Sequence, residues 1–163
     1  MSSLESMVHW NNKQYIAIQV KEDDTVVAIA LDSNFKLRSD ATPFKGETSS
    51  ISNWLDTLNI KANGKGEAAG IKALCYGQTV DVDNVLKDAI LNNKNLNYEV
   101  IDVSSIINYF NDNDGMHVRK ISFPKMKIRY VASQLKIDEP KGSWQQVMEI
   151  SLIYKKLTER GVL

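Results

Sequence analysis

The sequence has few of the residues that staple small secreted proteins or build metal sites. Its 163 residues include one cysteine, three prolines and two histidines. The single cysteine, Cys75, excludes an internal disulfide, and no Cys/His cluster has the spacing of a zinc site. The chain also lacks an apolar run long enough for a membrane span and the basic-then-apolar start of a secretory signal. We therefore expect a soluble, cytoplasmic protein without a membrane partner.

The sequence also has no excess charge of either sign. Twenty basic and twenty acidic residues give a formal net charge of +0, which argues against nucleic-acid binding by bulk charge. The basic residues are nevertheless uneven, since no acid stands between residues 119 and 136. The charged residues of this basic stripe are Arg119, Lys120, Lys125, Lys127, Arg129 and Lys136. It fits either a surface that holds a phosphate backbone or an ordinary solvated helix face.

The first part of the chain has the pattern of a strand meander followed by a helix. Apolar residues predict strands over residues 14–20 and 25–31, and turn residues 32–34 lead into a predicted third strand over residues 35–39. Pro43 and Gly46 then break the pattern. A helix is predicted after Ser49 or Ser50, because its apolar residues recur at helical spacing. Those residues are Ile51, Trp54, Leu55 and Leu58.

The central part has the pattern strand, turn, helix, strand. Residues 71–76 form a short apolar strand, residues 77–80 a turn, and residues 98–102 the next strand. Asp81 opens the helix between them, at the point where α/β proteins place ligand-facing groups. Asp81 is also a good helix N-cap residue, so a purely structural role is the alternative.

The last part is predicted to be helical. Helices are expected over residues 104–110, from Ser122 onward, and from Ser143 to Gly161, where Ser143 and Gln146 make a capping box. Residues 1–12 are expected to be a flexible terminus and residues 61–70 a flexible loop. Three strands followed by alternating helices and strands predict one α/β domain over residues 1–163, with a mixed sheet and helices on both faces.

Three short motifs follow one another along the chain. The first strand ends in a run that includes Gln19 and Lys21, Asp81 opens a helix after a strand and a small-residue turn, and Trp144 precedes Glu149 by five residues near the start of the last helix. In this order, the motifs resemble those of the DEDD 3′–5′ exonucleases of proofreading, phage and bacterial type. The resemblance covers nearly the whole chain. It implies a ribonuclease H-like sheet, in which a three-strand antiparallel meander precedes parallel strands.

The same resemblance implies a site that this chain has altered. Such exonucleases hold two divalent cations among four carboxylates and use a histidine as general base. The matching positions here are Gln19, Lys21, Asp81 and Glu149, with Trp144 in place of the histidine. Two acids and one lysine remain, whereas Mg²⁺ prefers carboxylate oxygens in octahedral geometry. This set favours a pseudo-enzyme without a cofactor.

Two of the substituted positions each have two interpretations. Lys21 either replaces the metal, as an ammonium between Asp81 and Glu149, or points into solvent from a strand end. Trp144 either stacks on a base, as aromatic residues do in single-strand binding sites, or packs against the last helix.

Two functions therefore follow from the sequence. The first is a non-catalytic module of DNA or RNA metabolism that binds single-stranded nucleic acid or a protein partner. Its expected nucleic-acid-binding residues are Arg119, Lys120, Lys125, Lys127, Arg129 and Trp144. The alternative is an active 3′–5′ exonuclease that uses Mg²⁺ or Mn²⁺, with Asp81 and Glu149 as ligands beside Asp32 or residues 22–24.

Overall fold

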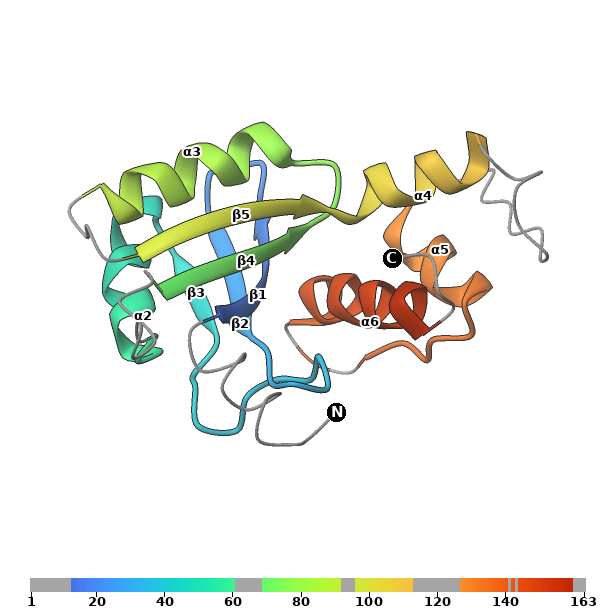
Figure 1. Cartoon of the computed structure of the whole chain (residues 1–163), viewed down its shortest axis with the longest axis horizontal. Coiled ribbons are helices and arrows are strands. Elements are labelled where there is room, and N and C mark those ends of the chain that lie inside the picture. Colours follow the sequence, from blue (N-terminus) through green and yellow to red (C-terminus); the bar gives the residue numbers. More distant parts are fainter. Residues whose placement is uncertain are drawn as a thin grey trace.

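The protein is built around a mixed β-sheet, shown in Figure 1. The computed structural model describes residues 13–60, 69–91, 96–112, 127–140, 142 and 144–159. Within these residues the sheet has five strands in the order β3-β2-β1-β4-β5. The strands are β1 (Lys13–Val20), β2 (Val26–Ala30), β3 (Phe44–Gly46), β4 (Ala69–Cys75) and β5 (Leu96–Asp102). The pairs β1–β2 and β2–β3 are antiparallel, whereas β1–β4 and β4–β5 are parallel.

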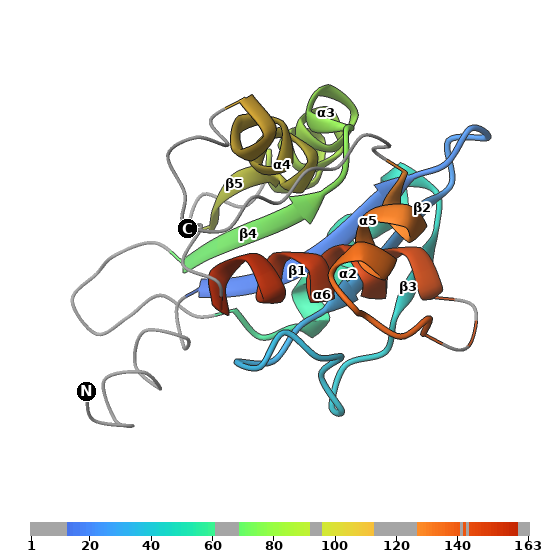
Figure 2. The same ribbon diagram turned by 90° about the vertical axis from the view of Figure 1, so that its right-hand side faces the viewer.

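Helices cover both faces of this sheet. They are the short 3₁₀ helix η1 (Thr48–Ser50) and the α-helices α2 (Ile51–Thr57), α3 (Thr79–Ile90), α4 (Val103–Asp112), α5 (Ile128–Gln134) and α6 (Gln145–Glu159). Successive side chains of a strand point to opposite faces. In β1, Ile16 and Ile18 belong to the core under α2 and α3, while Ala17 belongs to the core under α5 and α6. Figures 1 and 2 show α3 and α6 on opposite sides of the strands. The predicted α/β class with a mixed sheet is confirmed.

The predicted third strand over residues 35–39 is wrong, because β3 lies further along the chain at Phe44–Gly46. Phe35 has a φ of 59°, outside the extended region. Its ring packs edge-on against Tyr15 and Tyr154, with centroids 5.1 and 5.4 Å apart. Leu37 makes only an isolated bridge to Leu31. The aromatic contacts therefore replace strand geometry in this segment.

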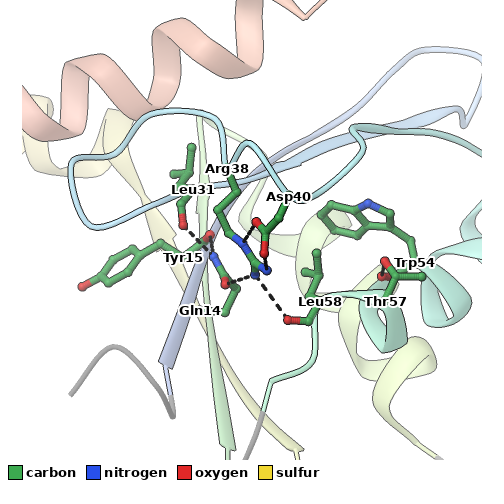
Figure 3. Close-up of polar contacts among 8 residues, drawn as sticks. All are labelled: Gln14, Tyr15, Leu31, Arg38, Asp40, Trp54, Thr57 and Leu58. Carbon is green, nitrogen blue, oxygen red and sulfur yellow. Dashed lines mark hydrogen bonds and ion pairs between the residues drawn. The ribbon is translucent and has the colours of Figure 1, made fainter. Parts of the chain in front are cut away.

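A buried polar network holds the same segment against the start of β1, as Figure 3 shows. The side-chain amide of Gln14 donates to the carbonyl of Leu31 (2.8 Å), and its oxygen accepts from Nη1 of Arg38 (2.7 Å). The same Nη1 lies 3.3 Å from the carbonyl oxygen of Leu58 after α2. Asp40 accepts two bonds of 2.8 Å from the Arg38 guanidinium. One arginine thus ties together β1, the segment after β2 and the end of α2.

The segment that precedes β3 is anchored to α2 by one aromatic side chain. The indole nitrogen of Trp54 donates to the carbonyl of Thr42 (2.7 Å), and the ring lies 5.8 Å from that of Phe44. Trp54 is itself buried in the core under α2 and α3. Residues 44–46 are therefore held beside β2, where they extend the sheet although Pro43 precedes them and Gly46 ends the strand.

Several predicted boundaries shift or fall outside the described residues. Helix α3 begins at Thr79 with Gln78 as N-cap, so Asp81 lies in the first turn and the N-cap interpretation is wrong. Residues 69 and 70 belong to β4 rather than to the predicted loop. The predictions for residues 1–12 and 61–68, and the helix ends at Ser122, Ser143 and Gly161, lie outside the described residues. Among the helices that the structure describes, none is both long and apolar enough to cross a bilayer.

Candidate binding groove

The end of β1 lies where the first turns of α3 and α6 meet the sheet. At the N-cap of α3, the side chain of Gln78 makes two hydrogen bonds with the backbone of Val20. Its Nε2 donates to the Val20 carbonyl (2.6 Å), and its Oε1 accepts from the Val20 amide (2.9 Å). A glutamine can match both groups of one residue because its amide carries a donor and an acceptor side by side. This pair fixes the start of α3 against the end of β1.

A second amide contact joins β1 to α6. Nε2 of Gln19 donates to Oε1 of Gln146, at 2.6 Å. Gln19 shares its face of the strand with Ala17, which packs in the core under α6. Gln146 stands in the first turn of α6, next to the buried Val147. Two residues 127 positions apart are thus brought together near the end of the central strand β1.

Two pockets flank this amide contact. The larger, of about 590 Å³, is lined by Gln19, Val20, Lys21, Glu22, Asp23, Gln78 and Gln146. The smaller, of about 220 Å³, is lined by Gln19, Lys21, Val27, Gly142, Trp144, Gln145, Gln146 and Val147. Because both pockets share Gln19, Lys21 and Gln146, we treat them as one feature, the strand-end groove.

Three of the five residues matched to the exonuclease motifs line this groove. They are Gln19, Lys21 and Trp144. Lys21 is exposed, and Trp144 is half-buried. Trp144 also packs against the core under α5 and α6. Its two predicted roles are therefore compatible, since one part of the side chain packs while another part lines the pocket.

The other two matched residues lie elsewhere. Asp81 is exposed in the first turn of α3 and is absent from the lining of both pockets. Glu149 is 2% exposed, and its Oε2 lies 2.9 Å from Nη1 of Arg129 on α5. Since α3 and α6 cover opposite faces of the sheet, these two acids do not form a pair.

The cation beside Glu149 is Arg129, and not Lys21 as one interpretation of the sequence had it. Lys21 makes no ion pair with Asp81 or Glu149 among the described residues. Arg129 also donates from Nη2 to the carbonyl of Ile137 (2.6 Å), so it links α5, the following segment and α6. Burial raises the pKa of Glu149, and the positive charge of Arg129 acts in the opposite direction.

The predicted basic stripe is only partly described by the structure. Arg119, Lys120 and Lys125 lie outside the described residues. Lys127 is exposed directly before α5 and is accessible to a ligand. Arg129 points to Glu149, so its guanidinium is engaged inside the protein. Its role as a phosphate contact stays a prediction, since the side chain is 38% exposed while the guanidinium also pairs with Glu149.

The carboxylates proposed for an active nuclease are also dispersed. Asp32 follows β2 and lies beside the start of β1, whereas Lys21 follows the end of β1. The carboxylate of Asp32 accepts hydrogen bonds from the amides of Asn34 and Lys36. Glu22 and Asp23 line the larger pocket. No three His, Cys, Asp or Glu side chains gather into a group that could hold a metal within the described ranges. Amides and one lysine, which dominate the shared lining, do not fit a pair of magnesium ions.

Asp102, which the sequence predicts only as the end of a strand, holds the neighbouring turn and helix starts in place by hydrogen bonds. Its Oδ1 accepts hydrogen bonds from the Gly77 amide (2.8 Å), the Ser104 amide (3.0 Å) and the Ser104 hydroxyl (2.7 Å). Its Oδ2 accepts from the hydroxyls of Thr79 (3.1 Å) and Ser105 (3.2 Å). Burial alone would raise the pKa of Asp102, but these bonds outweigh it and lower the pKa. The carboxylate joins the end of β5 to the turn before α3.

Two groove residues were also missed or given another role. The sequence predicts only a turn position for Gln78 and a capping-box position for Gln146, yet both residues line the larger pocket. A glutamine within the turn that joins a predicted strand to a predicted helix was the available signal for Gln78. Comparison of the chain with protein-family models, curated proteins and solved structures found no match.

Proposed function

We propose that the protein is a non-catalytic, ribonuclease H-like relative of the 3′–5′ exonucleases that binds single-stranded nucleic acid in the strand-end groove without a metal ion. The strand arrangement supports the fold part of this proposal. The meander β3-β2-β1 is antiparallel, β4 and β5 continue the sheet in parallel, and helices lie on both faces. This is the arrangement that the motif resemblance implies.

The observation that carries the proposal is the hydrogen bond between Gln19 and Gln146. Gln19 stands at a position where the resemblance implies a metal-binding carboxylate, and its neutral amide instead bonds the neutral amide of Gln146. Catalysis by two metals requires anionic oxygen ligands that hold both cations near the attacking and leaving oxygens. With Glu149 held by Arg129 and Asp81 outside the groove lining, the matched positions, all of which the structure describes, offer groups for binding but no carboxylate pair for that chemistry.

The groove has the components of a single-strand binding site. Lys21 supplies an exposed positive charge for a phosphate, and Trp144 supplies an aromatic surface for a base. Lys127 lines neither pocket and is an exposed cation directly before α5. Base stacking contributes about 1–3 kcal/mol per base in such sites, so Trp144 should account for a large share of the affinity.

The test is a binding and cleavage experiment with end-labelled single-stranded DNA and RNA. Fluorescence anisotropy measures the affinity in EDTA. We expect the wild type to bind, Trp144→Ala to bind about tenfold more weakly, and Lys21→Glu to bind more weakly as well. A matched control, Lys87→Glu, changes the same charge on the exposed face of α3. Cleavage in Mn²⁺ that is lost in Asp81→Ala would instead establish the active exonuclease. Failure to bind either strand would overturn the proposal and direct the search to a protein partner.

A further inference from the structure

We propose that Gln19 and Gln146 form a base-edge reader, in which the two coupled amides hydrogen-bond the Watson–Crick edge of one unpaired nucleobase. This inference rests on the proposed function, since it names what the strand-end groove recognises. It adds a recognition chemistry at the position where the resemblance implies metal ions.

The contact between Gln19 and Gln146 leaves part of their hydrogen-bonding capacity unused. A glutamine side chain has one carbonyl oxygen and one NH₂ group. The bond from Gln19 to Gln146 uses the nitrogen of the first and the oxygen of the second. Oε1 of Gln19 and Nε2 of Gln146 have no hydrogen-bond partner within the part of the chain that the structure describes. Within those residues, one acceptor on Gln19 and one donor on Gln146 are therefore left for a ligand.

This conclusion does not depend on which way the amides are drawn. If the oxygen and nitrogen of both side chains are exchanged, Gln146 donates to Gln19 and the remaining groups are again one donor and one acceptor. Adenine, cytosine, guanine and thymine each present a donor next to an acceptor on the Watson–Crick edge. An unpaired base therefore complements the amide pair in one of its two arrangements, and recognition by that edge is typical of single strands.

The surroundings of the pair favour a nucleotide over other donor–acceptor ligands such as a peptide. Both glutamines line both pockets, and Lys21 lines both as well. Trp144 lines the smaller pocket, where an aromatic face can stack on the same base whose edge meets the amides. An amide pair, an aromatic ring and a cation together match the edge, face and phosphate of one nucleotide.

The amide pair is also held in place from both sides. Gln19 belongs to β1, whose end is fixed by the two bonds between Gln78 and Val20. Gln146 precedes Val147, which is 1% exposed in the core under α6. Preorganised donors and acceptors lose less conformational entropy on binding than free side chains do. The pair therefore does not need to form when the base arrives.

The experiment compares a short oligothymidylate with the same strand made from N3-methylthymine, which lacks the donor on its Watson–Crick edge but retains the ring and phosphates. In EDTA, the wild type should bind the unmodified strand at least about fivefold more tightly, the discrimination typical of a two-bond base contact. The double variant Gln19→Leu, Gln146→Leu should bind both strands equally. The control Gln134→Leu, at an exposed position on α5, should discriminate as the wild type does.

The outcomes separate this inference from the proposed function. Equal binding of both strands by the wild type overturns the base-edge reader while the nucleic-acid-binding function stands. Unchanged discrimination in the double variant also overturns it. Binding of neither strand overturns both proposals. Urea unfolding of the double variant checks that it folds, and single Gln19→Leu and Gln146→Leu variants repeat the test should the double variant fail to do so.

Discussion

Nη1 of Arg129 and Oε2 of Glu149 lie 2.9 Å apart as an ion pair, and neither atom makes a hydrogen bond within the described residues. The carboxylate is almost fully buried, whereas the arginine side chain is 38% exposed. The ion pair therefore fixes α5 against α6 and withdraws Glu149 from the groove. Of the positions where the motif resemblance implies acids, the groove keeps only Gln19 and Lys21, an amide and an ammonium.

Replacing Arg129 by alanine should leave a buried carboxylate without its cation. We expect the free energy of unfolding to fall by about 3 kcal/mol at neutral pH, as in other buried pairs that lose one partner. Urea denaturation measures the change. The double variant Arg129→Met, Glu149→Leu should regain most of the loss, because it removes both charges and keeps the packing. Lys127→Ala, an exposed neighbour, serves as the control.

The destabilisation by Arg129→Ala should also depend on pH. Burial already raises the pKa of Glu149 in the folded protein, and loss of the arginine charge raises it further. A carboxyl group with a raised folded-state pKa favours the folded state while protonated, and this contribution is lost as pH rises through that pKa. The difference in unfolding free energy between Arg129→Ala and the wild type should therefore be small at about pH 4 and reach its full size at about pH 7. A difference that does not vary with pH would contradict this account of Glu149.

Asp102 should make the fold sensitive to acid. Its pKa is lowered in the folded state, so its contribution is present above the ordinary value of 3.8 and is lost as pH falls through the lower folded-state pKa. Asp102→Asn should cost about 2 kcal/mol at neutral pH, because hydrogen bonds to a charged acceptor are lost. Urea denaturation of Asp102→Asn and of the wild type, measured at decreasing pH, should give midpoints that converge in acid. Asp56→Asn, at an exposed position of α2, provides the control.

The hydrogen bonds of the Gln14 side chain should contribute to the stability of the fold, although Gln14 stands at the start of a strand. Gln14→Leu leaves Nη1 of Arg38 without one acceptor and the Leu31 carbonyl without its side-chain donor. We expect a loss of about 2 kcal/mol in unfolding free energy, since unsatisfied buried groups cost about 1–3 kcal/mol. Thermal unfolding followed by circular dichroism measures it. Wild-type stability in Gln14→Leu would show that the network contributes nothing.

Cys75 should be unreactive in the native protein. Its side chain is fully buried in β4, and burial raises the pKa of the thiol to about 11, with the nearby Asp102 adding to the effect. Because the thiolate is the reactive form, a thiol reagent such as Ellman's reagent should react slowly at about pH 8. Addition of urea should bring rapid, stoichiometric reaction. Fast modification without denaturant would mean that β4 opens readily.

Sequence pattern predicted most of the fold because the main elements each have a clear apolar periodicity. The apolar run in residues 14–20 and the helical spacing of Val82, Val85 and Leu86 each mark a buried segment, on both faces for β1 and on one face for α3. The third strand failed at residues 35–39 for the opposite reason. Local alternation there competes with distant contacts, namely the rings of Tyr15 and Tyr154 around Phe35 and the bonds of Arg38 to Gln14.

The site shows the same division between local and distant causes. The sequence by itself determined an α/β chain with a mixed sheet and marked Gln19, Lys21 and Trp144, which do line one groove. Only the tertiary structure decided that Glu149 faces Arg129 and that Gln19 meets Gln146. Periodicity assigns a residue to a buried or an exposed face, but the partner on that face belongs to another element far away in the chain. Which residue becomes the partner depends on how the helices pack across the sheet, and no local sequence pattern encodes that packing.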